Sequence, residues 1–428
     1  MSRYLFIGGD AGGDVPPRLT VMAALVERGH QVDHLTVPWL PNQIGDTALE
    51  QNLNARVRAV GATPISSFAW EPTAPDTFGK PADEDLFRFD NVLTMSFFVT
   101  MATTIAHALR DQLRAQRYDA VGLDMAAMPA AAVCEAADVP YVVVTNTVPL
   151  LRWWPGRPCP GTGRVLASDN SEDEVLAKEM DALIDATWLE CANAIRREVG
   201  LSPLTHTTEL EDRAACVLVL TTAAFDYATH NAPSNYRFVG SCAPITTGPV
   251  DNVVDVSHDR PRVIMSPTTT SFAVGQVPFV KASIEALGSL PVDGIVTVGR
   301  SLDPARFAAA DNVTVLGHAP HGALLPGAAA MITHCGHGTV MTALHFGVPL
   351  IGLPDFADQR DIAARIVGHG VGLRLEKPPT AEAIRAAIEQ ILGDDSFRTA
   401  AARFAANAAT EDGPGAAAEV FSSLVREP

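Results

Sequence analysis

The chain has 428 residues, of which 47% are hydrophobic, and its formal net charge is −18 at pH 7. This length predicts two or three domains with sizeable cores. The acidic balance excludes nucleic acids and anionic membranes as partners, because the surfaces that bind them need clustered Lys and Arg.

The cysteines are scattered along the chain, without the spacing of metal ligands or of a disulfide framework. There are six of them, namely Cys134, Cys159, Cys191, Cys216, Cys242 and Cys335. We therefore expect reduced thiols, no metal ion and a cytoplasmic location. The apolar run at the amino terminus is too short for a signal peptide, and no later run has the roughly 18 apolar residues that a membrane span needs.

In the first half of the chain, strand-like apolar runs alternate with helix-like segments. The strands are predicted at residues 4–8, 31–37, 120–123, 141–145 and 217–221. This alternation indicates an α/β fold in which a parallel sheet has helices on both faces. The turn at residues 8–17 is rich in glycine, but it does not match G-x-G-x-x-G. Residues 34–38, at the end of the second strand, include no acidic residue, so we expect no nicotinamide or flavin cofactor.

A polar stretch at residues 241–260, which contains glycine and proline, separates the first half from a second alternating series. Strands are predicted there at residues 262–266, 294–298, 313–316, 330–333 and 350–353. The last segment, residues 397–424, is rich in alanine and helical in pattern. In open parallel sheets, ligands bind beyond the carboxyl ends of the strands, so we expect binding sites there.

The most informative motif is Thr-His-Cys-Gly-His-Gly-Thr at residues 333–339, between an apolar strand and the start of a helix predicted at Thr339. Unpaired N–H groups at a helix start bind anions such as phosphate. Gly336 and Gly338 would allow a close approach of the backbone to the anion, while His334 and Thr339 supply donors from their side chains. An ordinary capped turn is the alternative.

The surrounding segments decide between these interpretations. They are Asn-Val-Thr-Val-Leu-Gly-His-Ala-Pro-His at 312–321, Phe-Gly-Val-Pro-Leu-Ile-Gly-Leu-Pro at 346–354, and Asp358-Gln359. In this order and spacing the chain resembles the donor-binding signature of the family 1 nucleotide-sugar glycosyltransferases, bacterial natural-product type, most strongly over residues 311–375. The resemblance implies a GT-B fold, with two facing Rossmann-like domains, parallel sheets and an interdomain cleft.

On this basis residues 1–240 form an acceptor-binding domain, 241–260 a linker and 261–405 a donor-binding domain, and a helix at about 406–428 packs back on the first domain. The sequence alone equally allows a simple terminal helix. The resemblance further implies that His318 lies against the nucleobase, that main-chain groups near Ala319 read the base edge, and that Asp358 and Gln359 bind the sugar hydroxyls. The remaining donor-binding residues that it implies are His334, Gly336, His337, Gly338, Thr339 and Thr269.

Thr342 stands where plant-type relatives often have a glutamate that binds both ribose hydroxyls. A shorter side chain suits a nucleotide without the 2′ hydroxyl, so we favour a deoxythymidine diphosphate (dTDP) sugar over a uridine diphosphate (UDP) sugar. Asp361 stands where relatives frequently have asparagine, and the threonine-rich stretch that contains Thr269 replaces their Ser-x-Gly-Thr phosphate loop. We expect no cofactor beyond the nucleotide sugar.

Asp14 stands where relatives commonly have the general base histidine of a Gly-His-x-x-Pro turn. A carboxylate can remove the acceptor proton, most readily from a phenol or an activated carbon. Asp124 matches the aspartate that orients that histidine, so two carboxylates in one dry cleft would repel and share a proton. Both aspartates could instead cap helices, and Asp10 is the reserve candidate for the base.

Acceptor contacts are expected from Phe97, Trp153 and Trp154, since flat apolar rings suit a polycyclic aromatic compound. Phe97 also fits a packing role by its helical spacing. The sequence thus predicts an inverting, metal-independent transfer of a hexosyl or deoxyhexosyl group to a hydrophobic, phenolic natural product. Transfer to oxygen is favoured over carbon or nitrogen. A GT-B epimerase and a catalytically silent relative remain as alternatives, and a homodimer is open.

Overall fold

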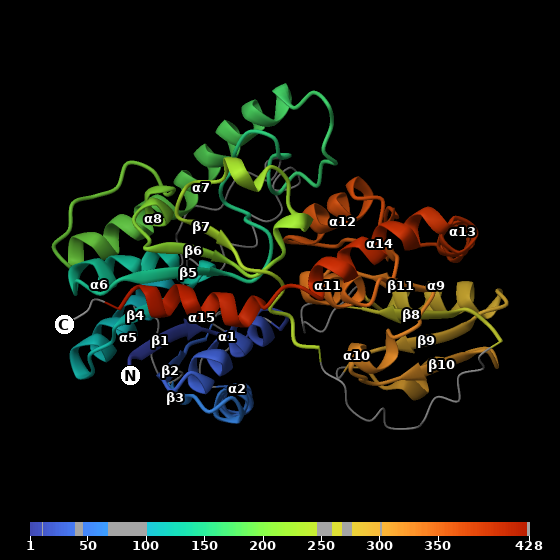
Figure 1. Cartoon of the computed structure of the whole chain (residues 1–428), viewed down its shortest axis with the longest axis horizontal. Helices are drawn as coiled ribbons and strands as arrows, with labels where there is room; N and C mark the ends of the chain where they lie inside the picture. Colours follow the sequence, from blue (N-terminus) through green and yellow to red (C-terminus); the bar gives the residue numbers. More distant parts are fainter. Residues whose placement is uncertain are drawn as a thin grey trace. The chain divides into compact units, whose positions relative to one another are not determined.

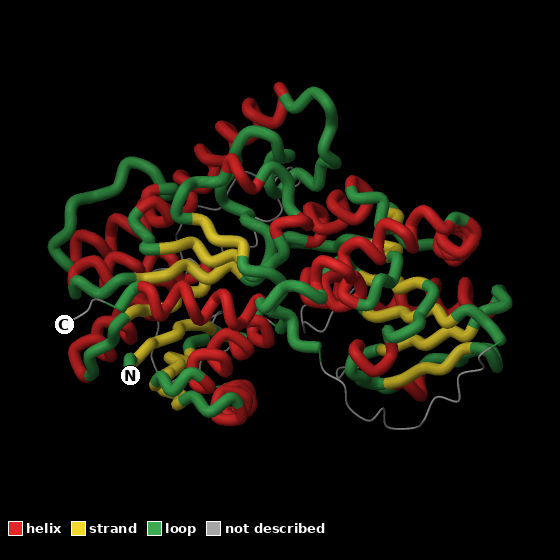
Figure 2. Tube along the Cα trace, viewed as in Figure 1, coloured by secondary structure: helices red, strands yellow, loops and turns green. Residues whose placement is uncertain are grey.

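The computed structural model describes residues 1–10, 12–38, 46–66, 101–245, 259–267, 276–299 and 302–425. The chain forms two compact units. The first comprises Met1–Thr162, Ala167–Cys242 and Asp412–Pro428, and the second comprises Gly163–Leu166 and Ala243–Glu411. Each unit is a parallel sheet with helices, which confirms the predicted α/β class (Figures 1 and 2). No helix in the described part is long and apolar enough to cross a bilayer.

The first unit has a parallel sheet in the order β3-β2-β1-β4-β5-β6-β7. Its strands are β1 (Arg3–Gly8), β2 (Gln31–Thr36), β3 (Thr63–Ser66), β4 (Ala120–Asp124), β5 (Tyr141–Thr145), β6 (Cys216–Val219) and β7 (Tyr236–Phe238). Its helices are α1 (Val15–Glu27), α2 (Thr47–Ala59), α5 (Ala102–Ala115), α6 (Ala131–Ala136), α7 (Ser171–Glu198), α8 (Glu209–Asp212) and α15 (Gly413–Ser423), with 3-10 turns η2 (Met125–Ala130), η3 (Ala223–Phe225) and η4 (Thr229–Asn231).

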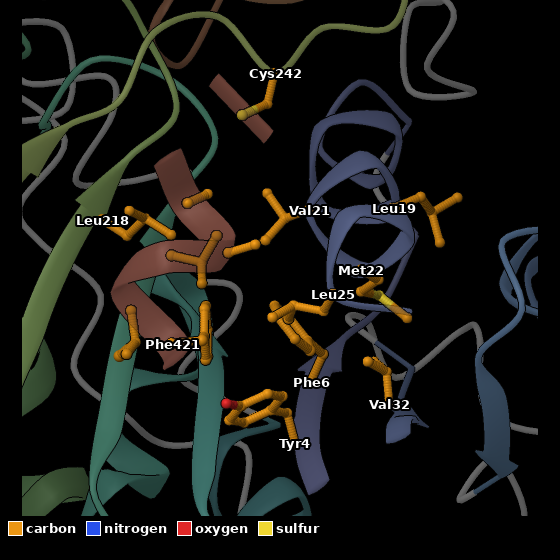
Figure 3. Close-up of a cluster of buried hydrophobic side chains, with 14 of the residues drawn as sticks. Tyr4, Phe6, Leu19, Val21, Met22, Leu25, Val32, Leu218, Cys242 and Phe421 are labelled. Carbon is orange, nitrogen blue, oxygen red and sulfur yellow. The ribbon is translucent and has the colours of Figure 1, made fainter. Parts of the chain in front are cut away.

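Helix α15 completes the core of the first unit, although it comes from the end of the chain. The fully buried Phe421 ring lies 4.9 Å from the Phe6 ring and 5.6 Å from the Tyr4 ring, between centroids (Figure 3). Gly122 leaves the room for this stack, because a Cβ there would lie 3.1 Å from Phe421 and 2.8 Å from Phe6. The predicted helical segment 397–424 is therefore two helices, and the second of them packs on the first unit.

The second unit has a parallel sheet in the order β10-β9-β8-β11-β12-β13. Its strands are β8 (Arg262–Ser266), β9 (Asp293–Thr297), β10 (Val313–Leu316), β11 (Ala330–Thr333), β12 (Leu350–Gly352) and β13 (Gly372–Arg374). Its helices are α9 (Gln276–Gly288), α10 (His321–Leu324), α11 (His337–His345), α12 (Gln359–Gly368), α13 (Ala381–Gly393) and α14 (Asp395–Ala408), with a 3-10 turn η5 (Pro304–Arg306). Ile332 and Ile384 lie in its apolar core.

The strand order of each sheet fixes where a ligand can bind. In the first sheet β1 and β4 are neighbours. The strand that follows β1 in the chain lies on one side of this pair, and the strand that follows β4 lies on the other side. The pair β8 and β11 has the same arrangement in the second sheet. A crevice opens at such a switch point, beyond the carboxyl ends of the two strands. Residues that follow β1, β4, β8 and β11 are therefore the first candidates for function.

Candidate functional site

At the switch point of the first sheet, Asp14 stands at the amino-terminal end of α1. It occupies the N-cap position and Pro16 is in the first helical turn, but the Asp14 side chain makes no capping hydrogen bond. Its side chain is 20% exposed. Asp14 therefore occupies the position of a helix cap, but its carboxylate does not act as one.

The fully buried Arg18 lies one helical turn after Asp14 and joins it to the end of β4. Its Nη1 is 2.8 Å from Asp124 Oδ2 and 3.9 Å from Asp14 Oδ2, and its Nη2 donates to the Gly9 carbonyl at 2.8 Å. A Cβ on Gly8 would lie 2.4 Å from this guanidinium. The glycine at the end of β1 is therefore what makes space for a buried arginine.

This arrangement corrects the expected pair of repelling carboxylates. A guanidinium lies close to both Asp14 and Asp124, so no shared proton is needed to relieve repulsion between them. Arg18 was not among the predicted site residues, although its spacing of four residues from Asp14 places both on one face of a helix. Asp10, the reserve candidate, is engaged elsewhere, since it accepts from the Gly12 amide and pairs with Arg56 at 3.0 Å.

Asp124 has the geometry of a structural group. Its Oδ1 accepts from the Ala126 amide at 3.0 Å, which caps η2, and its Oδ2 accepts from Asn146 at 2.9 Å as well as from Arg18. Burial raises the pKa of this carboxyl, and the hydrogen bonds and the charge of Arg18 oppose that rise. Asp124 thus fixes Arg18 in place, beside the carboxylate of Asp14.

At the switch point of the second sheet, the predicted anion turn follows β11. Cys335 has the left-handed backbone with φ of 69°, whereas Gly336, the N-cap of α11, has φ of −62°. The left-handed residue of this turn is therefore a buried cysteine and not a glycine. Helix α11 begins at His337, two residues earlier than predicted, and no side chain caps it. A Cβ on Gly338 would meet nothing within 4 Å, so this helix start is open to a ligand.

Two of the histidines predicted to bind the donor are held neutral at this turn. Burial lowers the pKa of His334 to about 4 and the pKa of His337 to about 4. His334 is 7% exposed, and its Nδ1 has no hydrogen-bond partner among the described residues. Its ring lies against Gly336, where a Cβ would be 2.4 Å from Nε2. A buried polar atom without a partner is costly, and a ligand at the helix start could supply one.

The second unit should become less stable as the pH falls, because these buried histidines then become protonated. Burial also lowers the pKa of His321 to about 4, and its Nε2 lies 3.0 Å from Ser266 Oγ. Because the folded pKa values lie below the unfolded value near 6.5, the stabilisation is present above pH 6.5 and is lost as pH falls towards 4. Each histidine contributes on the order of 3 kcal/mol at full titration. Unfolding in urea at pH 7.5, 6, 5 and 4.5 should show this loss, and a His321→Gln/His334→Gln/His337→Gln variant should show a shallower one.

The other predicted donor residues lie at the same edge of the second sheet. His318 is exposed and Ala319 is buried, between β10 and α10. Asp358 is the N-cap of α12 and its side chain makes no capping hydrogen bond. Gln359 is 4% exposed, and its Oε1 accepts from the amides of Asp355 and Phe356. Only the amide nitrogen of Gln359 is then available to a sugar hydroxyl.

The predicted aromatic residues divide between surface and core. The predicted acceptor contact of Trp154 is wrong, because this residue is 2% exposed. Its ring packs on Tyr236 and Phe238, with Arg157 above its face at 4.1 Å. Trp153 is partly exposed and its Nε1 donates to the Arg157 carbonyl. Phe97 and Thr269 lie outside the described residues. No group of three or more His, Cys, Asp or Glu side chains in the described part could hold a metal ion.

Comparisons with known proteins agree with this geometry. Residues 281–426 match the carboxyl-terminal domain of proteins like erythromycin biosynthesis protein CIII. The chain is 31% identical over 258 residues to 4'-demethylrebeccamycin synthase of Lentzea aerocolonigenes, covering 59% of the chain and 60% of that protein. It is 33% identical over 204 residues to aklavinone 7-beta-L-rhodosaminyltransferase of Streptomyces galilaeus, covering 46% of each. These alignments span about half of the relatives' length.

Solved structures extend the likeness to the whole chain. The glycotransferase of kitacinnamycin has a TM-score of 0.75 at 19% identity, covering 99% of both chains. The chain is thus similar to glycosyltransferases in sequence over part of its length and in fold over all of it. Spinosyn rhamnosyltransferase SpnG complexed with thymidine diphosphate has a TM-score of 0.68 at 17% identity, covering 99% of this chain and 100% of that one. At these identities the structures establish the fold alone, which is the predicted GT-B fold.

Proposed function

We propose that this protein is a family 1 glycosyltransferase that transfers a sugar from a nucleoside diphosphate to a hydrophobic, aromatic natural-product acceptor, with inversion at the anomeric carbon. The observation that carries this proposal is the start of α11, which is uncapped, open at Gly338 and flanked by the buried Nδ1 of His334. These groups suit a diphosphate, because helix N–H groups and ring donors bind anions. The curated relative from Streptomyces galilaeus is named as a rhodosaminyltransferase, which supports sugar transfer.

In the reaction, Asp14 accepts a proton from the acceptor hydroxyl while that oxygen attacks the anomeric carbon. The bond from this carbon to the diphosphate oxygen breaks, and the diphosphate leaves with the electron pair. Donors fixed at the start of α11, with the Thr339 hydroxyl and the neutral imidazole of His334, stabilise the charge that develops on the leaving group. These donors make a metal ion unnecessary. Arg18 favours the ionised form of Asp14, the form that a base requires.

The deciding experiment incubates the protein with radiolabelled dTDP-glucose or UDP-glucose and a panel of polycyclic phenols. Transfer of label to a phenol supports the proposal, and the chemistry of the product distinguishes O-, C- and N-linked sugars. Isomerised free nucleotide sugar would identify an epimerase. An absence of both, together with no binding of nucleoside diphosphate, would identify a catalytically silent relative.

We propose dTDP as the preferred nucleotide. Thr342 is buried, and its hydroxyl donates its only proton to the Gly338 carbonyl at 2.7 Å, so this short side chain has neither a proton for a ribose 2′ hydroxyl nor the carboxylate that would bind one. The solved complex of SpnG with thymidine diphosphate supports the same choice. We expect dTDP to raise the melting temperature more than UDP at equal concentration. Equal shifts for the two nucleotides would contradict the argument from Thr342.

A further inference from the structure

A short segment from the first half of the chain belongs to the second unit. The chain leaves the first unit after Thr162 and returns to it at Ala167, and the residues between them, Gly163–Leu166, group with the second unit. None of the helices and strands predicted from the sequence includes these residues. Val165 and Leu166 are 40% and 37% exposed, so burial of apolar side chains is not what holds the segment there.

Two hydrogen bonds, one buried and one partly buried, hold the segment by the backbone of Gly163. The Gly163 amide donates to Asp361 Oδ1 at 2.9 Å, and the Gly163 carbonyl accepts from Arg374 Nη1 at 2.9 Å. Asp361 is 3% exposed, and hydrogen bonds to a buried carboxylate are among the stronger ones. Both main-chain groups of Gly163 are thus bound by side chains that lie 198 and 211 positions further along the chain.

The fit at Gly163 also requires the absence of a side chain. Gly163 has φ of +63°, a conformation that favours glycine, and a Cβ there would lie 2.8 Å from Arg360 Cβ and 3.4 Å from the Arg360 carbonyl. The backbone of the segment therefore packs directly on the first turn of α12. Any larger residue at this position would be strained and would push the segment off the helix.

The same helical turn carries the residues proposed to bind the sugar. Asp358 and Gln359 are the N-cap and first residue of α12, and Asp361 is the third. Burial raises the pKa of the Cys335 thiol in the anion turn. The charge of Arg374 lowers this pKa and the charge of Asp358 raises it, so both side chains lie near the turn. The contacts that hold Gly163 are therefore next to the proposed sugar and diphosphate positions.

We infer that Gly163–Leu166, held by Asp361 and Arg374, forms one wall of the sugar subsite on the second unit and determines how the sugar of the donor is positioned. This inference rests on the proposed function. It gives a reason for aspartate at position 361, since a buried carboxylate is a stronger acceptor for the Gly163 amide than the neutral carboxamide of asparagine. The nucleotide itself does not depend on this wall.

The test distinguishes effects on binding of the sugar from effects on binding of the nucleotide. Dissociation constants for dTDP and dTDP-glucose, or for UDP and UDP-glucose, are measured by calorimetry without acceptor for the wild type, Gly163→Ala and Asp361→Ala. Gly163→Ala changes the segment and leaves the α12 sequence intact, so it serves if Asp361→Ala does not fold. The matched control is Glu376→Ala, because Glu376 is 79% exposed and pairs with Arg374 Nε, whereas Arg374 Nη1 is the group that binds Gly163.

Both test variants should bind the nucleotide sugar about tenfold more weakly, while their affinity for the free nucleoside diphosphate changes less than about twofold. The control should bind both ligands as the wild type does. Equal weakening of both ligands in Gly163→Ala would mean that the segment only supports the fold and would overturn the inference, as would unchanged affinity for both. A wild type that binds neither nucleotide would instead refute the proposed function.

Discussion

Replacement of Asp14 by asparagine is expected to lower the rate of transfer by about 10²–10⁴-fold, the range for loss of a general base. The fold should persist, because the Asp14 side chain makes no capping hydrogen bond and lies 3.9 Å from Arg18. Asparagine has nearly the same shape but cannot accept the acceptor proton. The measurement is the turnover of a phenolic acceptor at saturating nucleotide sugar, with the melting temperature and dTDP affinity recorded alongside.

The matched control for this variant is Asp10→Asn, in the same glycine-rich turn. Asp10 pairs with Arg56 and accepts from the Gly12 amide, and asparagine can retain the second contact. Its turnover should stay within a few-fold of the wild type. If Asp14→Asn turned over acceptor normally and Asp10→Asn did not, the base would be Asp10.

The sequence predicted every central strand of the two sheets, but of the four edge strands it predicted only β10. Runs such as residues 141–145 and 330–333 match β5 and β11 residue for residue, because strands buried on both faces are continuously apolar. The strands that were not predicted, β3, β7 and β13, are edge strands of their sheets, with the sequences Thr-Pro-Ile-Ser, Tyr-Arg-Phe and Gly-Leu-Arg. An edge strand is half-exposed, so its sequence lacks the apolar run that marks a central strand.

The candidate site was predictable where it is local in sequence. The anion turn and Asp14 each follow a single strand, so a strand, a turn and a helix start were enough to place them at the end of a sheet. The contact between Gly163 and Asp361 joins residues 198 positions apart, and no local pattern predicts such a pairing. Trp154 was assigned wrongly because its partner Arg157, which covers the ring, comes from a loop whose path the sequence does not reveal.

Arg18→Met is expected to have the largest effect on stability. Arg18 is fully buried and its removal leaves the Asp124 carboxylate, 4% exposed, without its counter-ion. Loss of one partner from a buried ion pair costs about 3–5 kcal/mol, because the remaining charge stays uncompensated. Urea unfolding at pH 7.5 measures this loss. A variant as stable as the wild type would mean that Asp124 is already neutral in the folded protein.

The double variant Arg18→Met/Asp124→Asn separates the two roles of this arginine. With both charges removed no uncompensated carboxylate remains, so much of the lost stability should return. The coupling between the two substitutions in the free energy of unfolding should exceed about 2 kcal/mol. Transfer should remain low, because Arg18 also lies beside Asp14 and favours the ionised base. Recovery of transfer together with stability would show instead that Arg18 serves only to hold Asp124, and that Asp14 acts without a neighbouring positive charge.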